Sequence, residues 1–284
     1  MATIDVAGSP IEYVRRGTGE PLLLIQGMSG THAGWGEPFL SLLEPHLDLI
    51  AYDHPGIGAS APASGSLTIA DLAQSAAGVL DALGIERAHV LGISMGGMVA
   101  QELAIAHPER LSTLTLGCTY PGGTGSRLTD QAVIQRILAG FATGNAEERL
   151  RASFAVNVSP AFAAEPGEWG RFLVMAGEVP APIPVVFEQL RAAGLHNAGD
   201  RLHDISAPTL VVHGDRDEML DVLNGELIAR LVPGARLEIL PGVGHMFWWE
   251  QPEVAARLVL EHAESHQTAP AARSVLPGSR TAAQ

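Results

Sequence analysis

The stretch Gly92-Ile93-Ser94-Met95-Gly96-Gly97 decides the fold of this chain. It ends the apolar run Ala88 to Ile93, which has the pattern of a strand buried on both faces of a parallel sheet, and it opens a helical segment from Met95 to Ala106. Glycine two residues before and two residues after a serine permits a turn so sharp that larger side chains would collide with it. We therefore expect Ser94 to project its hydroxyl at the end of a strand. The amide of Met95, at the helix N-terminus, should point to where negative charge develops on a substrate carbonyl oxygen.

Strand and helix patterns alternate on both sides of this turn. Thr3 to Val6 and Ile11 to Arg16 should form a hairpin at one edge of a sheet. Further buried strands are expected at Pro21 to Gln26, Leu47 to Tyr52, Leu111 to Gly117, Thr209 to His213 and Arg236 to Leu240. Helical spacing is found at Pro38 to His46, Ile69 to Leu83, Asp221 to Leu231 and Pro252 to His262. This order predicts an α/β fold, in which right-handed crossovers build a mostly parallel, eight-stranded sheet with helices on both faces.

The alternation is interrupted once. From Tyr120 to Asp204 the chain has the pattern of several helices separated by glycine and proline, with no strand runs. We therefore expect a core in two parts, residues 1–119 and 205–264, with residues 120–204 inserted as a helical cap. The remaining residues, 265–284, lack an apolar period and should form a disordered tail.

Composition excludes several classes of function. All 17 basic side chains are arginine, so a Schiff-base lysine or a P-loop lysine cannot occur, and the formal net charge of −14 argues against nucleic acid and anionic membranes as partners. No secretory signal and no apolar run of roughly 18 residues is found. With Cys118 as its single cysteine the chain is expected to be cytoplasmic, without a metal, a dinucleotide or another cofactor. A homo-oligomer is compatible with the sequence.

A serine hydroxyl is a poor nucleophile at neutral pH, so it needs a histidine base, and that base needs an acid that fixes its tautomer. His245 lies in Pro241-Gly242-Val243-Gly244-His245, after a strand pattern and before the last helix, which makes it the candidate base. The other histidines have structural interpretations, including His213 at a strand exit.

The acid is expected in Val212-His213-Gly214-Asp215-Arg216-Asp217, where another strand ends after the inserted helices. On spacing alone, either aspartate can be the acid. Asp215 can instead cap the loop or pair with Arg216, which favours Asp217.

With these residues in place, the chain resembles the α/β-hydrolase family from its start to about His262. The order Ser94, Asp217, His245 is that family's order of nucleophile, acid and base. Three stretches are similar to family motifs: Tyr52-Asp53-His54-Pro55-Gly56-Ile57-Gly58-Ala59-Ser60, Gly214-Asp215-Arg216-Asp217, and Gly244-His245 followed by Glu250-Gln251-Pro252-Glu253. The nearest groups are the non-haem bromoperoxidase-like, 3-oxoadipate enol-lactonase-like and polyketide methylesterase-like hydrolases.

The resemblance implies a second oxyanion donor, a backbone amide, which the amide of Met28 would supply beside that of Met95. Two positions depart from the family: Gln26-Gly27-Met28-Ser29-Gly30 replaces a common His-Gly start, and Ile93 precedes the nucleophile. Neither change removes a backbone donor. Ser94 argues against haloalkane dehalogenases and epoxide hydrolases, which carry aspartate there, and Asp53 is expected to brace the site through hydrogen bonds.

These features predict a serine hydrolase that cleaves a small or medium apolar carboxylic ester or lactone. Most cap aromatics should hold the cap together, while some line an apolar pocket. The candidates for lining it are Trp35, Phe141, Trp169, Met246 and Phe247. Two alternatives reuse the triad, a perhydrolase or bromoperoxidase-like activity and the hydrolysis of a carbon–carbon bond, and a third is a ligand sensor without turnover.

Overall fold

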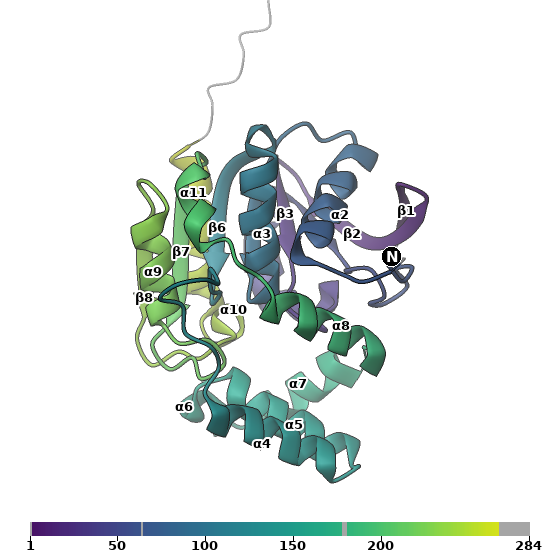
Figure 1. Cartoon of the computed structure of the whole chain (residues 1–284), viewed down its shortest axis with the longest axis vertical. Helices are drawn as coiled ribbons and strands as arrows, with labels where there is room; N and C mark the ends of the chain where they lie inside the picture. The colour runs from purple at the N-terminus through teal and green to yellow at the C-terminus, as the bar shows by residue number, and fades with distance from the viewer. Residues whose placement is uncertain (1, 64, 178–180, 267–284) are drawn as a thin grey trace, which may run out of the picture.

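The sheet has eight strands in the order β1-β2-β4-β3-β5-β6-β7-β8 (Figure 1). The computed structural model describes residues 2–63, 65–177 and 181–266. The strands are β1 (Ala2–Val6), β2 (Ser9–Gly17), β3 (Glu20–Ile25), β4 (Leu47–Tyr52), β5 (Ala88–Ile93), β6 (Leu111–Gly117), β7 (Thr209–Gly214) and β8 (Arg236–Leu240). The pairs β1–β2 and β2–β4 are antiparallel, and all the other neighbours are parallel. The predicted hairpin edge and mostly parallel sheet are thus confirmed.

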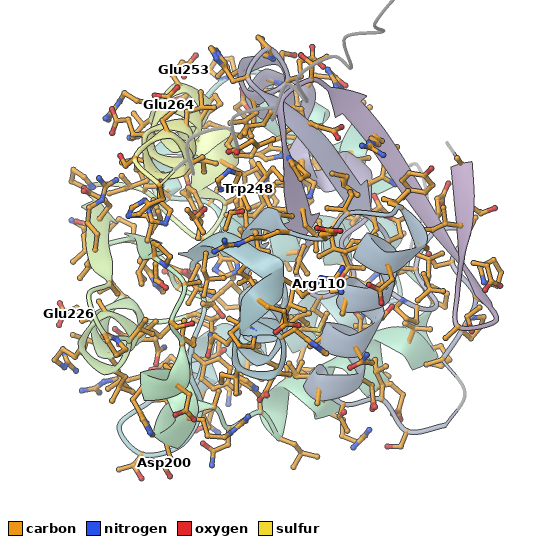
Figure 2. The ribbon with its side chains drawn as sticks, turned by 90° about the horizontal axis from the view of Figure 1, so that it is seen from above. Arg110, Asp200, Glu226, Trp248, Glu253 and Glu264 are labelled. Atoms are coloured by element: carbon orange, nitrogen blue, oxygen red, sulfur yellow. The ribbon has the colours of Figure 1, made fainter. Side chains whose placement is uncertain are left out.

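Helices cover both faces because the central strands are apolar on both faces. Leu23 and Leu24 are consecutive in β3 and belong to opposite cores, as the alternation of side chains along a strand requires. One core includes residues of α2 (Ile69–Ala82), α3 (Met95–Ala106) and α9 (Leu223–Leu231). The other includes residues of α1 (Glu37–Leu43), α10 (Phe247–Glu250) and α11 (Pro252–Glu264). Figure 2 shows Trp248 inside, with Glu226, Glu253 and Glu264 at the periphery.

Helix ends follow local chemistry. The α2 helix begins at a capping box, in which the Thr68 hydroxyl accepts from the Asp71 amide at 3.1 Å and the Asp71 carboxylate accepts from the Thr68 amide at 3.0 Å. The predicted helix from Pro38 to His46 was wrong at its end, because α1 stops at Leu43. Pro45 has no amide hydrogen to continue the helical bonding.

The segment between β6 and β7 is helical, as predicted. It comprises α4 (Gln131–Ala142), α5 (Ala146–Asn157), α6 (Pro160–Ala163), α7 (Glu168–Gly177), α8 (Ile183–Gly194) and the 3-10 helix η3 (Gly199–Asp204). Figure 1 shows α4 to α7 together beyond one end of the sheet. Both ends of the segment return to the body of the protein, since Tyr120 and Leu202 belong to the α2–α3 core. Most of the predicted tail, residues 267–284, lies outside the described residues.

None of the helices in the described ranges combines the length and the apolar character needed to cross a membrane.

Candidate active site

The turn after β5 holds Ser94 in a strained conformation. Its φ of 54° and ψ of −123° lie in a region that L-residues rarely adopt. The two flanking glycines are required because a side chain at either position would collide with nearby backbone. A Cβ on Gly92 would lie 2.3 Å from the carbonyl oxygen of Gly96, and a Cβ on Gly96 would lie 2.1 Å from that of Ile25. The expectation that small residues permit this turn is therefore confirmed, and the tight turn exposes part of Ser94 at the end of the strand.

Bonds from the next strand fix the serine's backbone. The Ser94 amide donates to the carbonyl of Gly117 at 2.9 Å, and its carbonyl accepts from the Thr119 hydroxyl at 2.7 Å. On the other side, the turn after β3 passes over the serine, because a Cβ on Gly27 would lie 3.6 Å from the Ser94 hydroxyl oxygen. Ser94 is thus enclosed between the ends of β3 and β6.

Two backbone amides near this serine are free to donate. In the described part of the chain, no acceptor is bonded to the amide of Met28, which follows Gly27, or to that of Met95, the first residue of α3. An unpaired amide at a helix N-terminus carries partial positive charge. Both amides therefore suit the stabilisation of an oxyanion formed beside Ser94.

The predicted acid and base are in direct contact. Asp217 follows β7 and His245 follows β8, and the Nδ1 atom of His245 lies 2.7 Å from the Asp217 Oδ2 atom. The other carboxylate oxygen, Oδ1, accepts from the amides of Met219 at 2.8 Å and Leu220 at 2.9 Å. With its side chain fully buried and both oxygens bonded, Asp217 is held in a single orientation.

The two aspartates after β7 lie in different surroundings. Asp215 is exposed, accepts from the Gly242 amide at 2.7 Å and lies 3.7 Å from the Arg216 guanidinium. It caps the loop, in agreement with the alternative role given to it above. His213 is buried, as expected of a structural histidine, but its Nε2 atom also lies 3.1 Å from Asp217 Oδ2. This second imidazole on Asp217 was missed by the sequence analysis.

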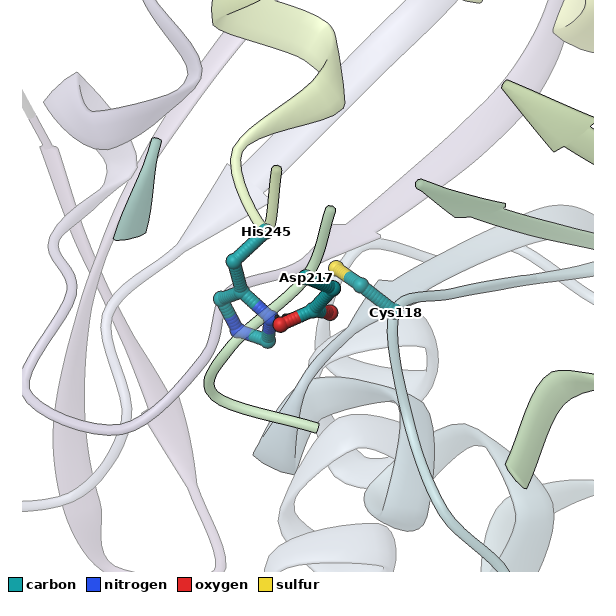
Figure 3. Close-up of side chains that lie close together, drawn as sticks. All are labelled: Cys118, Asp217 and His245. Atoms are coloured by element: carbon teal, nitrogen blue, oxygen red, sulfur yellow. Dashed lines mark hydrogen bonds and ion pairs between the residues drawn. The ribbon is translucent and has the colours of Figure 1, made fainter. Parts of the chain in front are cut away.

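Cys118 lies between the base and the serine turn. Figure 3 shows its thiol beside Asp217 and His245, and the three donor atoms lie within 4.8 Å of one another. The thiol also contacts the backbone of Ser94. Among the described residues, no hydrogen bond joins the Ser94 hydroxyl to His245. The two residues are connected through Cys118, whose thiol contacts both His245 and the backbone of Ser94. With a φ of 38°, Cys118 is a second strained position of the site.

Electrostatics favour an ion pair within the buried acid–base couple. Burial lowers the pKa of His245, but the attraction of the Asp217 carboxylate outweighs this and holds the pKa well above its ordinary value. Burial favours the neutral form of Asp217, whereas His245 and His213 together hold its pKa below the ordinary range. Burial raises the pKa of the Cys118 thiol, so it is neutral at pH 7.

Two polar residues that the sequence analysis did not single out tie the helical segment to the site. The Gln189 side chain of α8 accepts from the Ser29 amide at 2.8 Å, directly after Met28. Glu250 accepts from the amides of Gly244 at 2.8 Å and Ser159 at 2.9 Å, which joins the His245 loop to the start of α6. Only the stretch Glu250-Gln251-Pro252-Glu253 gave a sequence signal for such a role.

The pocket candidates divide between core and cap. Trp35 and Phe247 are fully buried, and the Trp35 ring packs on Phe39 and Trp248 with centroids 5.9 and 5.7 Å away. Met246 is buried next to the base. Trp169 packs on Phe154 and Phe172, so it contributes to the aromatic cluster of the cap. Phe141 lies in α4, and its side chain is outside the described residues. A role in lining a substrate pocket stays a prediction for all five.

Asp53 forms hydrogen bonds directly after β4. Its Oδ1 atom accepts from the His32 amide at 2.6 Å, which links the end of β4 to the 3-10 helix η1 (His32–Trp35). Two groups of side chains have donor sets suited to a metal ion: Cys118, Asp217 and His245, and separately Glu12, His32 and Asp53. The first group belongs to the acid–base couple.

Comparisons with known proteins agree with this geometry. The model of the alpha/beta hydrolase fold family matches residues 20–252. A 2-hydroxymuconate semialdehyde hydrolase of Pseudomonas putida is 31% identical, over 90% of this chain and 91% of the relative. Among solved structures, a hydrolase from Pseudomonas aeruginosa PA01 is similar with a TM-score of 0.78 and 30% identity, covering 92% of this chain and 97% of that one. A thermophilic esterase from Thermogutta terrifontis is similar with a TM-score of 0.77 and 25% identity, and the match covers 94% of this chain and 99% of the esterase chain.

Proposed function

The chain belongs to the α/β-hydrolase family, and from this premise we propose that it is a serine hydrolase that cleaves a small or medium apolar carboxylic ester or lactone. One observation carries the proposal: the 2.7 Å contact between His245 and Asp217 lies beside the strained turn of Ser94. This arrangement supplies a nucleophile, a base and an acid at one end of the sheet.

The proposed reaction has two steps. The Ser94 hydroxyl attacks the carbonyl carbon of the ester while His245 accepts its proton, and the amides of Met28 and Met95 donate to the oxygen that becomes negative. His245 then gives the proton to the leaving alkoxide, which leaves an acyl group on Ser94. Water attacks this acyl-enzyme with His245 again as base, and the acid is released. Asp217 keeps the histidine in the required tautomer and stabilises its positive charge.

The relatives support hydrolysis, and they differ in what their names say they hydrolyse. The similar esterase favours an ester substrate. The semialdehyde hydrolase of Pseudomonas putida is named for a substrate that is not an ester, and it favours a second candidate, the hydrolysis of a carbon–carbon bond by the same triad. Product analysis separates the two reactions, because only the second breaks a carbon–carbon bond in a substrate that contains no ester.

The proposed function is tested by replacing the nucleophile. Ser94→Ala should lower kcat for p-nitrophenyl butyrate at least about 10⁴-fold without loss of folding, because it removes the group that forms the acyl-enzyme. Ser75→Ala, on the partly exposed side of α2, is the matched control and should keep the parent rate. A fluorophosphonate should label the parent and not Ser94→Ala. Parent activity in Ser94→Ala would contradict the proposal, and a parent that is neither labelled nor active would favour a ligand sensor.

A further inference from the structure

A second cluster of titratable side chains lies outside the Ser94 machinery. Glu12 on β2, His32 at the start of η1 and Asp53 directly after β4 each offer one donor atom, and these atoms lie within 4.8 Å of one another. Glu12 is 8% exposed and Asp53 is 0% exposed. Two carboxylates are therefore brought together in the protein interior, with an imidazole beside them.

The hydrogen bonds of this cluster leave one oxygen without a partner. Asp53 Oδ1 accepts from the His32 amide at 2.6 Å and lies 3.0 Å from the His32 Nδ1 atom. Glu12 Oε2 accepts from the Ala59 amide at 2.6 Å. Asp53 Oδ2, in contrast, is buried without any partner among the described residues. A buried carboxylate oxygen in this state is costly, so a bound positive group would stabilise it.

The unpartnered oxygen and Glu12 Oε2 both lie beside Gly58. A Cβ on Gly58 would lie 2.1 Å from Asp53 Oδ2 and 2.6 Å from Glu12 Oε2, so both oxygens lie close to the Gly58 backbone and no side chain fits between them and that backbone. One member of the cluster, His32, borders a cavity. A cavity of about 760 Å³, lined by β2, β4, α1 and α7, reaches His32, whose side chain is 17% exposed.

We propose that Glu12, His32 and Asp53 form a binding site for a divalent transition-metal cation, such as Mn²⁺ or Zn²⁺. Carboxylate oxygens suit Mn²⁺ and imidazole nitrogen suits Zn²⁺, and both cations accept a mixed set of this kind. A divalent cation neutralises the two buried negative charges and gives Asp53 Oδ2 a partner. It also connects β2 and the end of β4 to the turn that carries Met28, four residues before His32, so its binding stiffens the oxyanion side of the site.

The test measures metal binding and stability and does not depend on activity. Protein treated with a chelator and desalted is titrated with Mn²⁺ and followed by electron paramagnetic resonance. We expect one Mn²⁺ per chain and a rise in Tm that EDTA reverses. Glu12→Gln and His32→Gln should each weaken binding at least about ten-fold. Glu12→Gln retains an oxygen for the Ala59 amide, so it should fold.

Two control variants address the other carboxylates and the other donor cluster. Asp48→Asn, at a carboxylate of β4 that pairs with Arg15, should bind Mn²⁺ as the parent does, which excludes general attraction to an acidic protein. Cys118→Ser should also bind as the parent does, although it alters the cluster at His245. The proposal is overturned if the parent binds neither Mn²⁺ nor Zn²⁺ at millimolar concentration, if both Gln variants bind like the parent, or if Cys118→Ser abolishes binding.

Discussion

Replacing Asp217 with asparagine tests how the site controls the tautomer of its histidine. In the parent, Asp217 Oδ1 accepts from two backbone amides, those of Met219 and Leu220, at 2.8 and 2.9 Å. An asparagine can satisfy both amides only with its carbonyl oxygen, because its NH₂ group cannot accept. The NH₂ group is then directed at His245, which lies 2.7 Å from Oδ2 in the parent.

The consequence for catalysis can be given a magnitude. An NH₂ donor forces His245 Nδ1 to accept, so the ring proton moves to Nε2, and that nitrogen can no longer take the proton of Ser94. The same change of tautomer in a serine protease lowers kcat by about 10⁴, which corresponds to about 5.5 kcal/mol of lost transition-state stabilisation. We expect a loss of this order for Asp217→Asn, since the two amides leave the side chain no other orientation.

The assay is steady-state hydrolysis of p-nitrophenyl butyrate, with urea denaturation to show that each variant is folded. Asp215→Asn is the matched control, because Asp215 is exposed and bonds only to the loop at Gly242 and Arg216; its kcat should stay within about three-fold of the parent. A folded Asp217→Asn variant that retained more than a tenth of the parent kcat would refute the reasoning. In the parent, kcat/KM should rise with pH, and the midpoint of this rise should lie above pH 6.5. The reason is that only the neutral imidazole accepts a proton and that Asp217 raises the pKa of His245.

Two further predictions concern stability. Tyr52 is buried and its hydroxyl has no partner among the described residues, so Tyr52→Phe should stabilise the fold by about 1 kcal/mol and raise Tm by about 2–4 °C. Tyr120→Phe loses a hydrogen bond to the Ala193 carbonyl and should destabilise the fold by about 1 kcal/mol. Calorimetry should therefore show Tm changes of opposite sign for the two variants. Burial lowers the pKa of His262 to about 4, so the unfolded chain binds a proton first as pH falls from about 6.5 to 4, and folding loses about 2 to 3 kcal/mol there. His262→Gln, whose amide can still donate to the Pro208 carbonyl, should flatten this dependence in urea titrations at pH 7 and 4.5, and an unchanged slope would contradict it.

The sequence was sufficient where local pattern alone determines structure. The bounds of β4, β5, α3 and β6 agree with the prediction, because apolar runs bounded by glycine and a helix opened by a tight turn are local signals. Both aspartates are spaced correctly after β7, and the preference for Asp217 came from the other roles open to Asp215 and from the resemblance to a family. The structure adds the reason: only Asp217 is turned inward to two amides and to His245.

Contacts between segments that are distant in the chain could not be predicted from local sequence patterns. Nothing near Cys118 in the chain indicates that its thiol touches His245, since that contact depends on β6 lying beside β7 in the sheet. The link from Gln189 to Ser29 spans 160 residues and depends on how α8 returns to the body. Glu12 and Asp53 likewise meet only because β2 pairs with β4.

Because Cys118 is buried, the rate at which its thiol is chemically modified can be used to measure local opening of the protein. It is the single thiol of the chain and is fully buried, so a reagent that modifies cysteine can react only with molecules whose strand ends have separated. When closing is fast compared with modification, the labelling rate measures the free energy of that opening. A bound substrate or inhibitor that holds the ends of β6 and β7 together would therefore be detected as slower labelling, without any engineered probe.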